Sequence, residues 1–552
     1  MAICARGIGG AGTGKTRMMM QTIEQAMSRP EVGGNPFVIG FSSFTRAARA
    51  EVARRLSEMT GVPQADLERD GWYRTGHSVA YRQLGVEKGE ILGGSKEDDE
   101  WVSNALGSEV RTSFDDEEGG IRAYMGDPVA AAALNYWSLA RSLVVPLRSV
   151  VENDVSYDAP PYSDVLKRIQ RYESAKRLDG RIDFTDLISR FVGVRFDPSR
   201  EPESVSPDGE VPGDVIGWVF DEAQDASKLL DMACRRLVTG ESVKWAWLVG
   251  DPFQVLFSWA GASAKHFMSW DVAREKTMPQ SYRCAAPIMK LGEDQLRKLQ
   301  MGEYWDRGIA PATHSGIVEE ADDYAEVLEG LDASEETLIV ARTNRQVRGI
   351  EFILREAGVP HRRVKSKEGA YAKDLGLAGL WKLENGKPID GAEWEQVLKI
   401  MPSRTTGGHT WIKSGFKKRW STELSEKYDL IWPEEIGELG ATDEFKSAIA
   451  SGKWSSLPDG GTFFAQATKA HGVDAVLTPR IRVGTIHSVK GQEADKVVIM
   501  SAVGRRVRMS EDLSPERFNE ERRIEYVAAT RARRHVVVAH DPRERYRMEY
   551  EL

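Results

Sequence analysis

The sequence has few cysteines and no long apolar run, and both absences narrow the classes of protein that it can encode. Only three of its 552 residues are cysteine, and no two of them form a C-x-x-C pair. This excludes a disulfide scaffold and gives no basis for a zinc or iron–sulfur site. No apolar run approaches the roughly 20 residues that span a bilayer, and the N-terminus lacks the apolar core of a signal peptide. We therefore expect a soluble, intracellular (cytoplasmic) protein without a membrane partner.

An excess of positive charge is also missing, although such an excess is common in proteins that bind nucleic acid. The formal net charge is −9, from 75 Lys and Arg against 84 Asp and Glu. Net charge governs solubility and long-range attraction, whereas a local basic groove is enough to hold a strand. The basic stretch at residues 413–420 (KSGFKKRW) is one candidate for such a surface. A solvated face without a ligand explains it equally well.

No internal repeat of fixed period occurs, which argues against a solenoid. At about 150 residues per domain, the length predicts roughly three or four domains. Short apolar runs rich in Val, Ile and Trp, separated by helical stretches, predict buried parallel strands of an α/β fold. These runs lie at residues 215–220, 245–249, 337–340, 497–500 and 536–539. Two mainly helical stretches, 75–183 and 365–478, look like insertions into two α/β cores.

A glycine-rich motif near the N-terminus predicts a phosphate site. Residues 9–16 (GGAGTGKT) match G-x-x-x-x-G-K-[ST] between a short strand and a helix expected from Lys15 to about Met27. Glycines let backbone N–H groups surround phosphate oxygens, and the helix N-terminus adds a favourable dipole. Lys15 is expected to reach the β- and γ-phosphates, and the Thr16 hydroxyl to bind Mg²⁺. The nucleotide-binding residues predicted by this motif are Gly9, Gly10, Ala11, Gly12, Thr13, Gly14, Lys15 and Thr16.

A second motif, DEAQD at residues 221–225, follows directly after the apolar run 215–220. Open α/β sheets place their ligands at the carboxyl ends of strands. Asp221 is suited to the Mg²⁺ shell, and Glu222 to orienting or deprotonating the attacking water. An acidic helix cap is the alternative. Two carboxylates and a glutamine in this order favour nucleotide hydrolysis.

These two motifs resemble the ATPase site of superfamily 1 helicases of the UvrD/Rep type. Further motifs of that family follow in order, and together they span residues 9–533. They are residues 44–48 (FTRAA), 75–78 (TGHS), 183–187 (DFTDL), 250–254 (GDPFQ) with 259–262 (WAGA), 280–283 (QSYR), 341–344 (ARTN), 485–493 (TIHSVKGQE) and 526–532 (YVAATRA). Any one piece could be accidental, but the ordered set is specific.

The resemblance implies two RecA-like P-loop NTPase cores with parallel sheets, each carrying a mainly helical insertion. The first core, 1A, would comprise residues 1–74 and 184–281, with insertion 1B at 75–183. The second core, 2A, would comprise residues 282–364 and 479–552, with insertion 2B at 365–478. ATP and Mg²⁺ would bind between the cores.

The resemblance also implies roles for individual side chains. Gln254 would sense the γ-phosphate, and Tyr282 would stack on the nucleotide base. Arg283 and Arg531 would neutralise transition-state charge, as arginine fingers do. Glu493 would hydrogen-bond the ribose.

A strand of nucleic acid is the second ligand that the resemblance implies. Bases stack on aromatic side chains without sequence preference, because every base has a π-face. The matching residues are Phe44, Phe257 and Trp259 for stacking, and Thr45, His77, Asn344, Thr485 and His487 for polar contacts to the strand. Core packing is the alternative for each ring, and the two histidines fit structural positions equally well.

The sequence departs from the family pattern at several points. Only eight residues precede Gly9, so the adenine-reading glutamine of the family is missing and the preference for ATP is left open. Ala260 stands where the family usually has Arg, so one link between hydrolysis and the strand is absent or supplied elsewhere. Ser281 and Ala494 replace the usual Asn and Phe. The second insertion is shorter than the regulatory subdomain of larger relatives.

From these features we expect an ATP-dependent DNA helicase that moves 3′ to 5′ on single-stranded DNA and acts at single-strand/duplex junctions. Replication or repair proteins are the expected partners. One alternative is a DNA-stimulated translocase that clears bound proteins and needs a partner to unwind. Another is a non-hydrolysing DNA-binding scaffold, against which the intact catalytic residues argue. RNA as the track stays open, and a nuclease domain is not expected because the chain ends shortly after Arg533.

Overall fold

The chain divides into two compact units. A computed structural model describes residues 2–43, 46–114, 122–154, 159–364, 368–402, 410–420, 429–512 and 514–551. The first unit contains Met1–Arg283, Gln295–Thr313 and Ser510–Tyr526, and the second contains Cys284–Asp294, His314–Met509 and Val527–Leu552. The stretches 295–313 and 510–526, which the resemblance groups with the second core, thus belong to the first unit. No described helix is long and apolar enough to cross a membrane.

The first unit is built on a six-stranded sheet in which all neighbouring strands are parallel, in the order β10-β1-β9-β8-β2-β3. Its strands are β1 (Ile3–Ile8), β2 (Ile39–Ser42), β3 (Trp72–Arg74), β8 (Gly217–Phe220), β9 (Trp245–Gly250) and β10 (Arg274–Thr277). The predicted strands at 215–220 and 245–249 are confirmed as β8 and β9. Their near-continuous apolar sequence suits strands that are buried on both faces.

Helices cover both faces of this sheet. They are α1 (Lys15–Met27), α2 (Arg46–Thr60) and α3 (Gln64–Asp70) on one face, and α4 (Gly76–Leu84), α9 (Phe184–Val192), α10 (Lys228–Leu237) and α11 (Ala264–Met268) on the other. On the first face Met19 and Leu56 pack against Val219. On the second face Leu187 packs in the same core as Phe220. The expected doubly covered α/β layer is confirmed.

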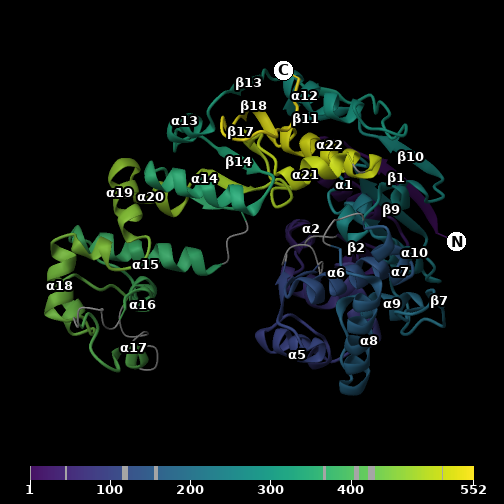
Figure 1. Ribbon diagram of the computed structural model, residues 1–552, viewed down its shortest axis with the longest axis horizontal. Coiled ribbons are helices and arrows are strands. Elements are labelled where there is room, and N and C mark those ends of the chain that lie inside the picture. Colours follow the sequence, from purple (N-terminus) through teal and green to yellow (C-terminus); the bar gives the residue numbers. More distant parts are fainter. Residues whose placement is uncertain are drawn as a thin grey trace. The chain divides into compact units, whose positions relative to one another are not determined.

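The first insertion, drawn in blue in Figure 1, is mainly helical as predicted. It contains α5 (Lys96–Leu106), β4 (Val110–Phe114), β5 (Arg122–Gly126), α6 (Pro128–Leu143), α7 (Leu147–Glu152) and α8 (Tyr162–Asp179). The antiparallel pair β4–β5 is a feature that the sequence does not predict. Leu134, Trp137 and Ile169 belong to a hydrophobic core of its own.

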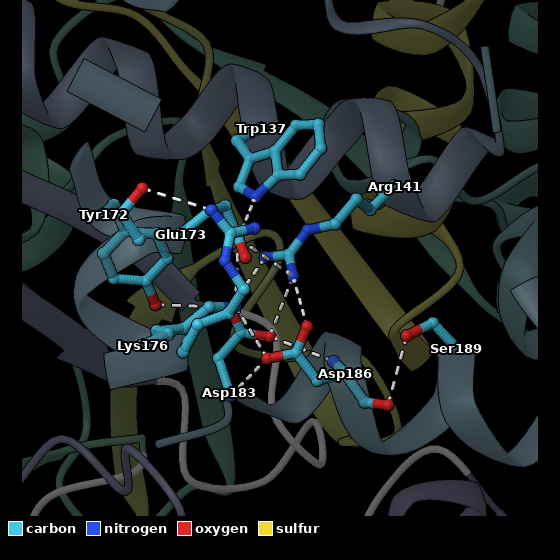
Figure 2. A network of polar contacts seen from close by, with 10 residues as sticks. Trp137, Arg141, Tyr172, Glu173, Lys176, Asp183, Asp186 and Ser189 are labelled. Carbon is cyan, nitrogen blue, oxygen red and sulfur yellow. Dashed lines mark hydrogen bonds and ion pairs between the residues drawn. The ribbon is translucent and has the colours of Figure 1, made fainter. Parts of the chain in front are cut away.

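A buried set of charges joins this insertion to the sheet-covering helix α9 (Figure 2). We call Arg141, Glu173, Lys176, Asp183 and Asp186 the insertion network. Arg141 Nη2 lies 2.8 Å from Asp183 Oδ2, and Arg141 Nη1 lies 3.0 Å from Asp186 Oδ1. Lys176 Nζ lies 2.9, 3.0 and 2.7 Å from carboxylate oxygens of Glu173, Asp183 and Asp186. Both aspartates of the DFTDL motif are therefore engaged in holding α6 and α8 to α9.

The pKa values of the two aspartates in the insertion network are shifted in opposite directions. Burial alone would raise the pKa of Asp183, but the Arg141 and Lys176 charges hold that pKa well below its usual range. Burial, assisted by the neighbouring Asp183 carboxylate, raises the pKa of Asp186 to about 6. The network has three acids and two bases, so a proton on Asp186 balances its charge.

The second unit contains another parallel six-stranded sheet, in the order β13-β18-β17-β14-β16-β15. Its strands are β13 (Ile317–Ala321), β14 (Thr337–Ala341), β15 (His361–Arg363), β16 (Ile481–Thr485), β17 (Ala494–Met500) and β18 (Ala532–Ala539). The three strands predicted at 337–340, 497–500 and 536–539 are confirmed within β14, β17 and β18. On one face, α13 (Tyr324–Glu329) and α14 (Asn344–Glu356) bury Leu328 and Ile350.

The second insertion, drawn in green in Figure 1, is helical as predicted and has a tryptophan-rich core. Its helices are α15 (Glu368–Glu384), α16 (Gly391–Ile400), α17 (Phe416–Arg419), α18 (Asp443–Ala450), α19 (Gly461–His471) and α20 (Val473–Leu477). Phe416 and Trp420, the two aromatics of the basic stretch, are buried in this core. Lys417 Nζ donates to the Met401 carbonyl at 2.7 Å. Much of that stretch therefore serves the fold.

The remaining elements are short or belong to both units. They are β6 (Val194–Arg195), β7 (Glu203–Ser204), β11 (Gln280–Ala285), α12 (Ala286–Arg297), β12 (Ala310–Ala312), α21 (Arg505–Glu511), α22 (Pro515–Ala529) and the 3₁₀ helices η1 (Pro36–Val38), η2 (Lys88–Glu90), η3 (Ala223–Asp225), η4 (Ser258–Ala260), η6 (Glu435–Gly437) and η7 (Lys453–Ser456). The chain passes from the first unit into the second within α22, after Tyr526.

Candidate nucleotide and nucleic-acid site

The predicted phosphate loop connects β1 to α1 at the carboxyl edge of the first sheet. Gly9 N donates to the Gly250 carbonyl at 2.9 Å, which fixes the start of the loop to the end of β9. Gly12 (φ 68°) and Gly14 (φ 82°) are left-handed. A Cβ on Gly12 would lie 2.2 Å from the Arg283 Cβ, so glycine is required there. Gly14 gives α1 no side-chain cap, and an uncapped first turn is suited to binding an anion.

Lys15 and the two predicted Mg²⁺ ligands, Thr16 and Asp221, lie at the same edge of the sheet. Lys15 Nζ donates to the Gly9 carbonyl at 3.3 Å, so the side chain folds back over the loop. Thr16 lies in the first turn of α1, and the buried Asp221 directly follows β8. A hydroxyl and a carboxylate fit Mg²⁺, which keeps water and phosphate oxygens as its other ligands. The described residues contain no group of three or more His, Cys, Asp or Glu that could hold a metal ion.

Glu222 has a backbone conformation that is rare for a residue with a side chain, at φ 49°. Such strain concentrates at functional positions. Its Oε2 accepts a hydrogen bond from Gln224 Nε2 at 2.7 Å, and Gln224 Oε1 accepts from Asp251 N at 3.1 Å. A Cβ on Gly250 would lie 2.3 Å from Gln224 Oε1. A glycine at the end of β9 therefore lets the buried Gln224 amide connect Glu222 to the next loop.

Gln254 belongs to a buried group of four residues that we call the Asp251 cluster: Asp251, Gln254, Arg307 and Tyr526. Gln254 Nε2 donates to Asp251 Oδ2 at 2.8 Å, and the Tyr526 hydroxyl donates to the same oxygen at 3.1 Å. Arg307 Nη1 donates to Asp251 Oδ1 at 2.7 Å. The sequence predicts a role only for Gln254. Asp251 could have been found from its place after an apolar strand, but no local pattern marks Arg307.

Strand β11 brings two further predicted residues to the phosphate loop. Tyr282 N donates to the Gly12 carbonyl at 2.8 Å. Ser281 Oγ donates to the Ala11 carbonyl at 2.8 Å, which gives the departure at Ser281 a physical role. The Tyr282 ring is 70% exposed beside the loop and is therefore placed where a nucleotide base could stack. The adjacent Arg283 packs against Gly12.

The aromatic candidates for strand binding differ in exposure. Trp259, in η4, is 40% exposed, whereas Phe257 is 5% exposed and contacts the Trp259 ring edge-on at 6.4 Å. Of these two rings, Trp259 offers the larger face to solvent, and Phe257 packs as the core alternative predicts. His77 lies in the first turn of α4, with its ring 5.9 Å from that of Phe184. Phe44 and Thr45 lie outside the described residues.

The polar candidates of the second unit gather at the carboxyl edge of its sheet. Ala341 pairs with Thr485 at the ends of β14 and β16, and Ile486 N donates to the Ala341 carbonyl at 2.9 Å. Asn344 follows β14 and accepts from Arg363 Nη2 at 2.8 Å. Thr485 Oγ1 accepts from Ser488 N at 3.2 Å, and His487 lies in the same turn. The structure thus brings Asn344, Thr485 and His487 to one edge.

The last two predicted residues are held within the second unit. Glu493 Oε1 accepts from Arg533 Nη2 at 2.8 Å. The Arg531 side chain is buried, and its Nε donates to the Val527 carbonyl at 3.0 Å. These contacts fix the positions of both side chains.

Comparison with known protein families matches parts of both units to UvrD/REP-type helicase domains. The family described as UvrD/REP helicase N-terminal domain matches residues 8–273, and the UvrD-like helicase C-terminal domain matches residues 465–540. Together the two matches cover more than half of the chain and include most of the predicted site residues.

Individual relatives are distant but extend over most of the sequence. The ATP-dependent DNA helicase UvrD2 of Mycobacterium tuberculosis is 23% identical over 575 residues, covering 96% of this chain and 76% of the relative. The ATP-dependent DNA helicase PcrA of Staphylococcus aureus is 21% identical over 620 residues, covering 96% of this chain and 80% of the relative. DNA helicase II of Salmonella typhimurium is 24% identical over 431 residues, covering 73% of this chain and 55% of the relative. With its two parallel sheets, its phosphate loop and its ordered motifs, the chain belongs to the UvrD/REP family of superfamily 1, a family of ATP-dependent DNA helicases.

Proposed function

We propose that this chain hydrolyses ATP to move along single-stranded DNA from 3′ to 5′, and that this movement unwinds duplex DNA at a junction. One observation carries the proposal. Glu222, Gln224 and Asp251 form an unbroken series of hydrogen bonds that ends on Gln254, at the edge of the sheet that also presents Lys15. A general base and a candidate γ-phosphate sensor joined in this way fit hydrolysis better than simple binding.

We assign the hydrolytic roles as follows. Lys15 and the loop N–H groups hold the phosphates, Thr16 and Asp221 hold Mg²⁺, and Glu222 orients the attacking water. Mg²⁺, when bound, supplies positive charge to the phosphate oxygens.

Gln254 detects the γ-phosphate, and Tyr282 stacks on the base. Arg283 and Arg531 neutralise charge in the transition state, and Glu493 bonds the ribose.

The proposed strand contacts use the described candidates of both units. Trp259 stacks on a base with its exposed ring, and the buried Phe257 ring contacts Trp259 edge-on and supports it. His77 and the second-unit residues Asn344, Thr485 and His487 contact the strand backbone. The family resemblance, which carries the 3′-to-5′ direction, also supports the division into cores 1A and 2A with insertions 1B and 2B.

Strand displacement tests direction and unwinding together. The purified chain is given ATP, Mg²⁺ and duplexes that carry either a 3′ or a 5′ single-stranded tail. We expect displacement on the 3′-tailed duplex only, and none with Lys15→Ala. Displacement on the 5′-tailed duplex alone would contradict the proposed direction.

A second candidate function is a translocase that clears bound proteins and needs a partner to unwind. The observation that favours it lies in the second insertion, where Phe416, Lys417 and Trp420 of the basic stretch serve the fold. Fewer side chains then remain there to engage a duplex. Hydrolysis stimulated by single-stranded DNA, together with removal of a bound protein but no displacement on either duplex, would favour this candidate. Repair or replication proteins are the partners that we propose in either case.

A further inference from the structure

The Asp251 cluster contains a fully buried guanidinium for which the proposed mechanism has no role. Arg307 comes from the 295–313 stretch, and its side chain is 1% exposed. Its guanidinium lies 4.6 Å from the Phe253 ring and 5.4 Å from the Tyr526 ring. Both Nη atoms also lie 3.3 Å from the Tyr526 hydroxyl. A buried charge is costly unless it is paired, and Asp251, itself without exposed surface, is the partner.

The Asp251 carboxylate also accepts hydrogen bonds from three other groups. Oδ1 accepts from Phe253 N at 3.1 Å as well as from Arg307, and Oδ2 accepts from Gln254 and from Tyr526. A carboxylate with four donors in fixed places has few alternative orientations. The side chain of Gln254 is therefore oriented by an anion whose own position depends on Arg307.

The same cluster reaches the phosphate loop. Ala11 N donates to the Tyr526 hydroxyl oxygen at 3.3 Å, and that hydroxyl in turn donates to Asp251. Tyr526 stands on α22 five positions before Arg531. All four members of the cluster and the loop belong to the first unit, so the series of contacts lies within one compact body.

We propose that Arg307 is a positioning residue for ATP hydrolysis. Its buried guanidinium pairs with the Asp251 carboxylate and orients it toward Gln254 and Tyr526, and thereby holds Gln254 and the phosphate loop at Ala11 in the arrangement that meets the γ-phosphate. The inference deepens the proposed function, because it rests on the role assigned there to Gln254. Arg307 does not touch the nucleotide in this proposal and acts through Asp251.

The test separates positioning from simple support of the fold by measuring kcat and KM individually. Arg307→Met removes the charge at similar length, and Arg307→Lys keeps it. With saturating single-stranded DNA, we expect Arg307→Met to lower kcat for ATP hydrolysis on the order of 100-fold with KM changed less than about 3-fold, as misplacement of a reacting group does. Arg307→Lys is expected to recover about 10-fold of that loss, because the Asp251 carboxylate keeps a cationic partner.

Two outcomes overturn the proposal: an unchanged kcat in folded Arg307→Met, or a raised KM with kcat intact. Arg6→Met is the matched control, because Arg6 is also buried and paired with a carboxylate, Glu275, in the same unit, at 2.6 Å. Within the described part of the chain, no hydrogen bond links Arg6 or Glu275 to a member of the Asp251 cluster. We expect kcat within about 2-fold of wild type for this variant, since it removes only the contacts of Arg6 with Glu275 and with the Phe267 and Met268 carbonyls, none of which belongs to the Asp251 cluster.

If Arg307→Met does not fold, Tyr526→Phe decides the question. This variant removes one hydroxyl, and Tyr73→Phe removes an equally buried hydroxyl that donates to the Pro36 carbonyl at 2.6 Å. A loss of kcat in Tyr526→Phe but not in Tyr73→Phe supports the proposal, and equal behaviour of the two overturns it. Failure of the proposed function is distinct, because wild-type protein would then show no ATP hydrolysis at all.

Discussion

Two of the buried ion networks in the described part of the first unit differ in what they connect. The insertion network joins three helices, and its hydrogen bonds end on Trp137, Tyr172 and the backbone of α9. The Asp251 cluster has one acid and one base, and its hydrogen bonds end on Gln254 and the phosphate loop. In both networks the charged side chains are buried and paired. The groups that their outermost hydrogen bonds reach are different, and for this reason we assign a structural role to the insertion network and a role in hydrolysis to the Asp251 cluster.

Two equally acidic motifs of the first unit, DFTDL and DEAQD, also differ in their surroundings. The two aspartates of DFTDL form a capping box at the start of α9 and are surrounded by Arg141 and Lys176. Asp221 and Glu222 of DEAQD instead follow β8 at the carboxyl edge of the sheet, where we propose that the nucleotide binds. A carboxylate that is already satisfied by buried cations has little capacity left for a metal or a water.

The largest effect is expected from breaking the insertion network. Arg141→Met leaves three carboxylates, those of Glu173, Asp183 and Asp186, with Lys176 as their one remaining cation in the network, so we expect a loss of about 3–5 kcal/mol of local stability. Hydrogen exchange of α6, α8 and α9 measures this loss directly. The control is Arg111→Met, because Arg111 and Glu109 form an exposed pair whose loss costs less than about 1 kcal/mol. Equal exchange in the two variants would refute the structural role.

Next in size is removal of the proposed general base. Glu222→Gln keeps a hydrogen-bonding group beside Gln224 but cannot accept a proton, so kcat should fall on the order of 100-fold or more. The thermal unfolding midpoint should stay within about 2 °C, since no buried charge is left unpaired. Steady-state phosphate release and a melting curve on the same sample check both statements. A normal kcat in this variant would remove Glu222 from the mechanism.

A smaller, pH-dependent effect should distinguish the networks. The pKa of Asp186 is raised to about 6 by burial and by Asp183. Between about pH 4 and 6 the folded chain keeps a proton that the unfolded chain has lost, so stability falls as pH rises through this window and is flat above it. We expect a change on the order of 2 kcal/mol, which Asp186→Asn removes.

Hydrogen exchange of α8 between about pH 4.5 and 7 provides the measurement. Lower pH is avoided, because Asp183 has a lowered pKa and its stabilising contribution is lost as pH falls below the unfolded value of 3.8. A wild-type stability that is constant across the window would contradict the assignment of the proton to Asp186.

The smallest effect is expected for Tyr172→Phe. The Tyr172 hydroxyl donates to Asp183 Oδ2 at 3.2 Å, much as Tyr526 donates to Asp251. Loss of one such hydrogen bond should cost about 1 kcal/mol of stability and leave kcat unchanged. Urea unfolding and phosphate release measure the two quantities. A reduced kcat would mean that the insertion network also reaches the hydrolysis site.

Sequence patterns predict the parts of this molecule that are local. The strands β8, β9, β14, β17 and β18 each contain a continuous apolar run, and the phosphate loop is a contiguous motif. The Asp251 cluster is different, because Arg307 lies 56 residues from Asp251 and 219 from Tyr526. Nothing in a single sequence links such distant positions.

Burial is the other property that the patterns could not decide. Phe257 and Trp259 both stand in the motif where a stacking aromatic is expected, and only the folded structure shows that one ring is covered and the other exposed. The β4–β5 pair escaped prediction because two five-residue strands inside a helical stretch give a weak periodic signal.

The central claim is that the edge of the first sheet hydrolyses ATP in response to a DNA strand. Steady-state phosphate release with and without single-stranded DNA tests it most directly, on wild type, Glu222→Gln and Arg141→Met at a temperature where all three are folded. We predict strong stimulation by DNA in wild type and Arg141→Met, and almost none in Glu222→Gln. Absence of stimulated hydrolysis in wild type, or equal hydrolysis in Glu222→Gln, would contradict the claim.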